Sequence, residues 1–321
     1  MSDQNVLLQA NHLKKHFQGR GKNVVKAVDD VSITIHKGET VGLVGESGCG
    51  KSTLGRTLLR LIEPTEGEIF YNGQDLSKLS NKQMRQMRQH MQMVFQNPYS
   101  SLNPRMTVLD SVRAPLDIFK IGTPQERYEK CKEILQYVGF EEYQMYRYPH
   151  EFSGGQRQRI VIARALISQP DFIVCDEPVS ALDVSVRAQV LNLMRDINRD
   201  RGVAYLFISH DLSIVKHVSD RIAVMYLGNL VEIASCEELY RNPKHPYTQA
   251  LLSSIPIPDP DVKIERIPLE GDIPSPMNPP SGCRFHTRCR YATERCKREC
   301  PVFRYDENGH GVACHLCSGD I

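Results

Sequence analysis

The stretch Gly45-Glu46-Ser47-Gly48-Cys49-Gly50-Lys51-Ser52-Thr53, here called the phosphate loop, decides the fold class of this chain. It follows an apolar run, residues 40–44, that predicts a buried strand, and it precedes residues 54–61, which predict an amphipathic helix. A glycine-rich loop in this setting points several backbone N–H groups at one concavity, and the positive end of the helix adds to that field. Lys51 can then reach the β- and γ-phosphates, and the Ser52 hydroxyl can hold Mg²⁺. The pattern favours a nucleoside triphosphate site in an α/β fold over a chance lysine in a tight turn.

The length and charge of the chain limit its class. Its 321 residues allow one large domain or two smaller ones, and 40 basic against 38 acidic residues give no reason to expect nucleic acid as the main partner. No apolar run approaches the roughly 18–20 residues of a membrane span. Residues 1–8 lack the basic region and apolar core of a signal peptide. We therefore expect a cytosolic protein that could reach a membrane through a partner.

A second apolar run lies within residues 171–178, and two acidic residues, Asp176 and Glu177, follow its last apolar residue. The run predicts a buried strand, so Asp176 and Glu177 are expected at its carboxyl edge, where ligands bind in open α/β sheets. Asp176 suits the Mg²⁺ shell, and Glu177 suits polarisation of an attacking water. Two acids in this position are often only a solvated loop, but the phosphate loop in the same chain favours the catalytic interpretation.

A second candidate anion site begins at Ser153. Ser153 is a predicted helix N-cap, and Gly154 and Gly155 leave backbone N–H groups exposed at the helix start, just before Gln156. An isolated Ser-Gly-Gly turn would be uninformative. Its place about a hundred residues after the phosphate loop makes it a candidate phosphate contact.

Three single residues complete the candidate site. Gln96 follows a predicted strand, residues 91–95, and could sense Mg²⁺ or position water, although one glutamine is usually a loop residue. His210 follows another predicted strand, residues 204–209, and could contact a γ-phosphate. Phe17 is a possible platform for an adenine ring, with ordinary core packing as the alternative.

The spacing of apolar residues outside these motifs predicts the strands and helices that connect them. Short strands are expected before the phosphate loop, at residues 6–10, 24–28 and 31–35. Helices are expected after it, at residues 78–90, 106–119 and 124–138. We interpret the last two helices as an insert between core strands.

These motifs together resemble those of the ATP-binding subunit of an ABC transporter, over residues 5–240 and in the order typical of that family. The resemblance implies a P-loop NTPase cassette with a RecA-like core sheet, an N-terminal antiparallel β subdomain and an α-helical subdomain near residues 97–160. It implies that the chain binds ATP and Mg²⁺ and hydrolyses ATP. The signature begins with Phe152 where the family usually has leucine, an apolar change that leaves the anion site intact.

The resemblance also assigns roles to individual residues. The catalytic positions of the family correspond to Glu177, His210 and Gln96, and its Mg²⁺ ligands to Ser52, Gln96 and Asp176. The nucleotide-contacting positions of the family correspond to Phe17, Gly45, Ser47, Gly48, Cys49, Gly50, Lys51, Ser52, Thr53, Gln96, Ser153, Gly154, Gly155, Gln156, Asp176 and Asp183.

The family assignment implies partners. Two cassettes pack head to tail in this family, with each ATP between the phosphate loop of one and the signature of the other. Two membrane-spanning permease subunits dock near Gln96 and the helical insert, and an extracytoplasmic solute-binding protein joins the complex. The resemblance thus implies a peripheral subunit at the cytoplasmic face of the membrane.

The C-terminal part, residues 241–321, indicates which subfamily of ABC transporter ATPases the chain resembles. Residues 242–252, 274–283 and 148–151 are similar to those of dipeptide/oligopeptide and nickel importer ATPases. This implies peptide import and a subunit of the "F" type that pairs with a homologous "D" subunit. Import of nickel or another solute is the alternative, and a soluble ABC ATPase acting on nucleic acid is a second one that the near-neutral charge disfavours.

Cysteines gather near the end of the chain. Six of the 10 cysteines fall in the last 39 residues, at Cys283, Cys289, Cys296, Cys300, Cys314 and Cys317. In a reducing compartment such a group indicates a metal more than disulfides, and thiolates select zinc or an iron–sulfur cluster. The first spacings are wider than those of a usual zinc pair.

Importer ATPases with a similar tail carry a [4Fe–4S] cluster. That resemblance implies ligation by Cys283, Cys289, Cys296 and Cys314, with Cys300 or Cys317 as possible replacements and Zn²⁺ as the alternative metal. A tail this short would have trouble forming a core without such a staple.

Overall fold

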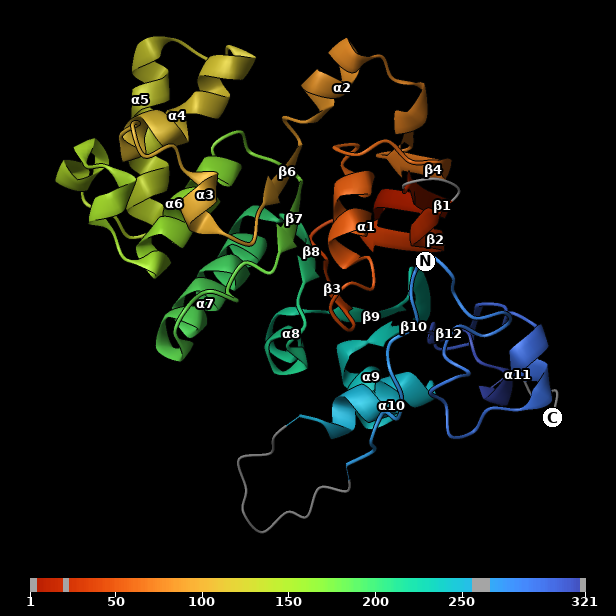
Figure 1. Ribbon diagram of the computed structural model, residues 1–321. Coiled ribbons are helices and arrows are strands. Elements are labelled where there is room, and N and C mark those ends of the chain that lie inside the picture. Colours follow the sequence, from red (N-terminus) through yellow and green to blue (C-terminus); the bar gives the residue numbers. More distant parts are fainter. Residues whose placement is uncertain (1–4, 20–22, 256–265, 318–321) are drawn as a thin grey trace. The chain divides into compact units, whose positions relative to one another are not determined.

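A computed structural model describes residues 5–19, 23–255 and 266–317 of the chain. The predicted C-terminal extension, residues 241–321, therefore includes two segments, 256–265 and 318–321, that lie outside the described residues. By its internal contacts the chain divides into two compact units (Figure 1). The first unit comprises Met1–Leu7, Ile35–Thr40 and Asp75–Ile208, and the second comprises Leu8–Thr34, Val41–Gln74 and Ser209–Ile321.

The first unit is built on three parallel strands. They are β6 (Met91–Val94), β7 (Phe172–Asp176) and β8 (Ala204–Ile208). Cys175 at the centre of this group pairs with Val94 on one side and with Phe207 on the other. Every residue of β7 and β8 is buried, as is typical of parallel strands with both faces covered. The strands predicted for these runs are confirmed.

Helices form the rest of the first unit (Figure 1). The α-helices are α2 (Asn81–Met87), α3 (Pro98–Ser101), α4 (Val108–Phe119), α5 (Pro124–Tyr137), α6 (Gly154–Leu166) and α7 (Val184–Arg201). Short 3₁₀ turns are η2 (Leu76–Lys78), η3 (Glu142–Tyr146) and η4 (Pro149–Glu151). Helices α3, α4 and α5 all pack against α6, and hydroxyls at Thr107, Thr123 and Ser153 cap α4, α5 and α6. The predicted helices at 106–119 and 124–138 are confirmed.

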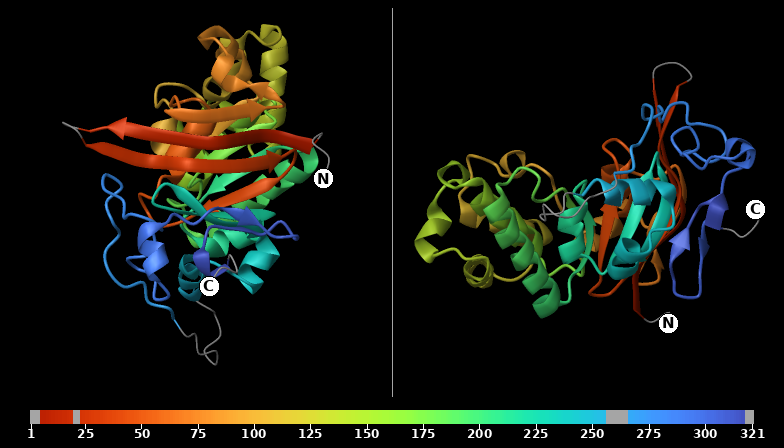
Figure 2. Two further views of the ribbon diagram at one scale, coloured as in Figure 1. Left: turned by 90° about the vertical axis from the view of Figure 1, so that its right-hand side faces the viewer. Right: turned by 90° about the horizontal axis from the view of Figure 1, so that it is seen from below.

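An antiparallel sheet, in the order β2-β1-β4-β5, makes up one part of the second unit. Its strands are β1 (Val6–Gln18), β2 (Val24–His36), β4 (Glu66–Tyr71) and β5 (Gln74–Asp75). Figure 2 shows β1 and β2 running side by side along almost their whole length. The prediction of two short strands at 24–28 and 31–35 was wrong, because β2 continues through Asp29 and Asp30, with a positive φ of 68° at Asp30.

The other strands of the second unit are ordered β11-β12-β10-β9-β3. Their bounds are β3 (Thr40–Val44), β9 (Arg221–Tyr226), β10 (Asn229–Ser235), β11 (Arg304–Tyr305) and β12 (Gly311–Val312). Strands β3 and β9 are parallel, whereas β9, β10, β12 and β11 pair antiparallel in turn. The pairing of Glu232 with Val312 makes the C-terminal extension a continuation of this sheet.

The helices of the second unit are short. They are α1 (Lys51–Leu58), α8 (Leu212–Val218), α9 (Cys236–Arg241), α10 (Pro246–Ser253), α11 (Glu294–Arg298) and the 3₁₀ turn η5 (His315–Cys317). Among the described residues, no helix has the length and apolar character needed to cross a membrane.

Two predicted helices have different limits in the structure. The helix expected at 54–61 begins at Lys51 and ends at Leu58, because Arg60 adopts a left-handed conformation with φ of 47°. The helix expected at 78–90 is confined to α2, where Ser80 forms a capping box with Gln83. Polar periodicity predicted the helix, but the chain must leave it before Met91 to enter β6.

Candidate functional site

The phosphate loop connects β3 to α1 through three glycines with positive φ. These angles are 150° at Gly45, 78° at Gly48 and 107° at Gly50, which is also the N-cap of α1. A Cβ atom at Gly45 would lie 2.1 Å from the carbonyl oxygen of Met225, and one at Gly50 would lie 1.9 Å from that of Ala27. Only glycine therefore allows this loop path. At Gly48 a Cβ would meet no atom within 4 Å, so the loop is open there.

Lys51 is folded back over the phosphate loop. Its side chain is buried, and its Nζ donates hydrogen bonds to the carbonyl oxygens of Gly45 at 2.7 Å and Glu46 at 3.0 Å. Burial raises the pKa of the Cys49 thiol nearby, while the Lys51 ammonium acts in the opposite direction. The loop thus holds a cation at its centre next to a protonated, buried thiol.

Glu46 is held through both its backbone and its side chain. Its backbone N–H donates to the Tyr247 hydroxyl at 2.9 Å, and its carbonyl accepts from Lys51. Its carboxylate accepts two hydrogen bonds from Arg288, from Nη1 at 2.7 Å and from Nη2 at 3.1 Å. The sequence did not predict the contacts of Glu46 with Tyr247 and Arg288. These partners lie 201 and 242 residues further along the chain, and no sequence motif connects residues so far apart.

In the first unit the structure brings Gln96 and Glu177 together. Gln96 Nε2 donates to Glu177 Oε2 at 2.8 Å. Asp176, the last residue of β7, is buried, and the backbone N–H of Glu177 donates to the carbonyl of Ile208 at 3.0 Å. Glu177 has a φ of 48°, uncommon for a residue with a side chain. This left-handed conformation turns the chain at the end of the strand, where the acids were expected.

The predicted signature lies at the start of α6. The Ser153 hydroxyl accepts from the Gln156 N–H at 3.3 Å, and the Gln156 side chain accepts from the Ser153 N–H at 3.0 Å. A Cβ at Gly155 would lie 2.1 Å from a methyl of Val186 in α7, so close helix packing explains this glycine. The capping box satisfies the helix start, which carries no acidic residue in its first turn.

Phe152 and Asp183 flank the helices α6 and α7. Phe152 is buried against Phe140, with ring centroids 5.6 Å apart in an edge-to-face arrangement. The phenyl ring therefore fills an apolar position beside the signature. Asp183 is exposed and is the N-cap of α7, although its side chain makes no capping hydrogen bond there.

Two further predicted residues, Phe17 and His210, are exposed in the second unit. Phe17 has 38% of its surface exposed, and Lys15 Nζ lies 5.0 Å from its ring centroid. This exposure speaks against core packing, the alternative considered for Phe17. His210 precedes Asp211, whose carboxylate accepts from the N–H groups at the start of α8.

The six tail cysteines differ in their contacts. The Sγ of Cys300 donates to the carbonyl of Gly282 at 3.1 Å, and that of Cys317 donates to the carbonyl of Lys244 at 3.7 Å. The other four lie within electrostatic reach of one another, and Cys314 also shares a side-chain hydrogen bond with Cys317. Burial, with smaller contributions from the thiols of Cys296, Cys314 and Cys289, raises the pKa of Cys283 to about 12. Within the described residues, no group of three or more histidine, cysteine or acidic side chains has the arrangement to hold a metal ion.

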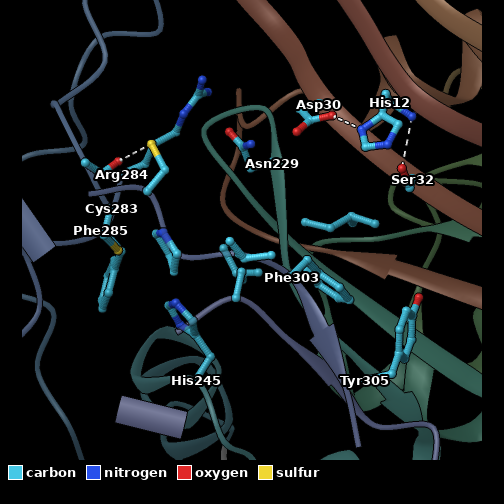
Figure 3. Close-up of a pocket in the computed structure, with 17 residues that line it drawn as sticks. His12, Asp30, Ser32, Asn229, His245, Cys283, Arg284, Phe285, Phe303 and Tyr305 are labelled. Atoms are coloured by element: carbon cyan, nitrogen blue, oxygen red, sulfur yellow. Dashed lines mark hydrogen bonds and ion pairs between the residues drawn. The ribbon is translucent and has the colours of Figure 1, made fainter. Parts of the chain in front are cut away.

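A cavity of about 430 Å³ lies between the extension and the strands of the second unit (Figure 3). Its lining includes Asn229, His245, Cys283, Phe285 and Phe303. No residue of the phosphate loop lines it, and its lining shares Cys283 and Cys300 with the predicted metal ligands and their possible replacements. The cavity is therefore separate from the predicted nucleotide contacts.

Comparison with known proteins identifies a family for the N-terminal part of the chain and another for its C-terminal part. The ABC transporter family profile matches residues 28–180, and the profile of the oligopeptide/dipeptide transporter C-terminal region matches residues 231–296. The putative oligopeptide transport ATP-binding protein YkfD of Bacillus subtilis is 56% identical over 97% of this chain and 95% of that protein. The oligopeptide transport ATP-binding protein AppF of the same organism is 53% identical over 99% of both chains.

A solved structure supports the cassette fold. The dimeric, post-hydrolysis structure of the ATP-binding cassette MJ0796 with ADP and phosphate bound has a TM-score of 0.65 and 29% identity. The match covers 72% of this chain and 99% of that chain.

A glycine-rich phosphate loop with a lysine, and acids at the end of a buried parallel strand, are features of P-loop NTPases, and the match to the ABC transporter family makes this chain an ABC-type ATPase. The chain belongs to the family of ABC transporter ATP-binding proteins that carry the oligopeptide/dipeptide transporter C-terminal region. It is an ATP-binding and ATP-hydrolysing transport subunit.

Proposed function

We propose that this chain powers an importer of oligopeptides or dipeptides from the cytoplasmic face of the cell membrane. The observation that carries the proposal is the 53% identity to the oligopeptide transport protein AppF across 99% of both chains. This identity extends through the C-terminal region, of which residues 231–296 match the oligopeptide/dipeptide transporter C-terminal family.

The proposed ATP contacts follow from the loop geometry. Backbone N–H groups of residues 45–53 cradle the β- and γ-phosphates, and Lys51 exchanges its bonds to loop carbonyls for bonds to phosphate oxygens. The hydroxyl of Ser52, the carboxylate of Asp176 and the amide of Gln96 supply oxygen ligands of the kind Mg²⁺ prefers. Phe17 offers an exposed ring on which adenine can stack.

Hydrolysis in this proposal depends on Glu177. Its carboxylate orients and polarises the attacking water, and Gln96 holds that carboxylate through its amide. His210 contacts the γ-phosphate as charge develops on the oxygens. The start of α6, Ser153 to Gln156, and Asp183 act on ATP held by a second cassette.

The proposed assembly contains four kinds of subunit. A homologous ATPase completes both ATP sites, two permeases span the membrane, and an extracytoplasmic protein delivers the solute. ATP closes the pair of cassettes, and its hydrolysis reopens them. The support for these partners is the membership of the chain in a transporter family.

We further propose that Cys283, Cys289, Cys296 and Cys314 hold a [4Fe–4S] cluster, with Zn²⁺ as the alternative. The donor set suits such a group, because soft thiolates select iron–sulfur clusters and zinc. Cys283 and Cys289 each lie within electrostatic reach of Cys296 and Cys314, which supports this choice of four. The hydrogen bond between Cys314 and Cys317 keeps Cys317 as the possible replacement. A bound cluster would supply cross-links that staple the extension.

The test of the transport proposal is uptake of a labelled tripeptide by cells whose only copy of this chain is plasmid-borne. Uptake is expected with the wild-type chain and not with Lys51→Ala. Uptake of labelled Ni²⁺ with no peptide uptake would replace peptide import by the nickel alternative. Salt-sensitive binding of DNA by the purified chain, without any solute uptake, would overturn the transporter proposal.

A further inference from the structure

We propose that the C-terminal extension positions the phosphate loop for ATP, with Arg288 and Tyr247 acting on Glu46 as positioning residues. The inference rests on the proposed function of residues 45–53. It extends that function by giving the extension a direct part in ATP affinity.

The contact between Arg288 and Glu46 is shielded and bidentate. Two guanidinium N–H groups donate to the two carboxylate oxygens at 2.7 and 3.1 Å, and the side chains are 6% and 21% exposed. Tyr226 adds its hydroxyl 3.5 Å from Arg288 Nη1. Glu46, by accepting these hydrogen bonds, raises the pKa of Arg288 above its ordinary value. A bidentate pair with so little exposure fixes orientation far better than an exposed ion pair.

The backbone of Glu46 is fixed at the same time. Its N–H points at the Tyr247 hydroxyl, 2.9 Å away, and its carbonyl accepts from Lys51 at 3.0 Å. Glu46 is the second residue of the loop, so these bonds set the direction of the peptides that lead to Gly48. A loop binds phosphate through the direction of such N–H groups. Fixing Glu46 therefore lowers the conformational entropy that ATP binding would otherwise have to remove.

Tyr247 and Arg288 are held in place by a buried aromatic cluster. Tyr226, Tyr247 and Phe285 are fully or almost fully buried and form an aromatic cluster with ring centroids 4.8 to 5.3 Å apart. Phe285 and Arg288 both lie in the segment between Cys283 and Cys289. Anything that orders this segment, including the thiols that flank it, thereby orders the contact to Glu46.

The experiment is a titration of the purified full-length chain with a fluorescent ATP analogue and Mg²⁺. Arg288→Met keeps the length of the side chain and removes the charge, and Tyr247→Phe removes the hydroxyl alone. Each is expected to weaken binding about five- to tenfold, the range for loss of charge-assisted or buried hydrogen bonds. Arg295→Met is the matched control, because Arg295 pairs with Glu299 on the exposed surface of the same extension.

A double-mutant cycle separates positioning from a general effect on folding. If Arg288 acts through Glu46, then Arg288→Met has no further effect on affinity in a Glu46→Gln chain. Unchanged affinity in Arg288→Met and Tyr247→Phe would overturn the inference, and so would an equal loss in both backgrounds. A wild-type chain that binds the analogue no better than Lys51→Ala would instead overturn the proposed ATP contacts themselves.

Discussion

The amide of Gln96 donates a 2.8 Å hydrogen bond to the carboxylate of Glu177. Gln96 comes soon after β6, and Glu177 comes directly after β7. The two strands are parallel neighbours, with Val94 opposite Cys175. Their carboxyl ends therefore meet at one edge, and a residue that contacts Mg²⁺ in our proposal also holds the proposed base.

Gln96→Ala is expected to lower kcat for ATP hydrolysis by the assembled transporter about tenfold, because Glu177 loses the bond that orients it. The Kd for MgATP should change less than the rate. Gln92→Ala is the matched control, since Gln92 lies in β6 and its amide donates to the Arg88 carbonyl instead. Equal rates for the two variants would contradict a positioning role for Gln96.

Lys51→Ala is expected to weaken MgATP binding at least about a hundredfold, since it removes the buried cation that in our proposal binds the phosphates. Isothermal titration calorimetry on the purified chain measures this directly. Lys82→Ala, at an exposed position of α2, should bind like the wild type. Retained affinity in Lys51→Ala would mean that the triphosphate binds elsewhere.

His245 makes the stability of the extension sensitive to pH. Burial lowers its pKa to about 4, and its Nδ1 accepts the Tyr247 N–H at 3.0 Å as the cap of α10. An unfolded histidine binds its proton near pH 6.5, so the unfolded state gains protons first as pH falls. The stabilisation is complete above about pH 6.5 and is lost towards pH 4, by up to about 3 kcal/mol.

Urea unfolding at a series of pH values tests this. His245→Asn retains a capping side chain and removes the titration, so its free energy of unfolding should fall less steeply between about pH 6.5 and 4. The same slope in both proteins would show that other groups, among them the buried carboxylate of Glu232 with its lowered pKa, cause the acid sensitivity.

Iron, acid-labile sulfide and zinc content of chain purified without oxygen tests the proposed cluster. We expect about four irons and four sulfides per chain, lost in Cys283→Ser and retained in Cys300→Ser, in keeping with a four-thiolate site. One zinc without sulfide would make the extension a zinc module. A chain that contains neither iron nor zinc would contradict both versions of the proposal.

The motifs of the nucleotide site could be predicted because each depends on local sequence. Continuous apolar runs predicted β3, β7 and β8, and glycines with a following lysine predicted the phosphate loop. The apolar run before Asp176 and Glu177 predicted that these acids lie at the carboxyl end of a buried strand, and β7 does end at Asp176. Patterns among residues that are close in the sequence can be recognised in a single sequence.

The contacts that cross long distances in the sequence could not be predicted. Arg288 and Glu46 are 242 residues apart, and either residue alone reads as an ordinary surface charge. Strand β2 was divided wrongly for a related reason. Asp29 and Asp30 resemble a turn locally, but Asp29 bonds His16 and Arg284 in the folded chain.

ATP hydrolysis by the assembled transporter carrying Glu177→Gln tests the central claim most directly. We predict that turnover falls at least about a hundredfold, the effect of losing a general base, while MgATP affinity is retained. The variant should then accumulate with ATP bound and the cassettes closed. Turnover equal to that of the wild type would contradict the account of this chain as an ATPase that depends on Glu177.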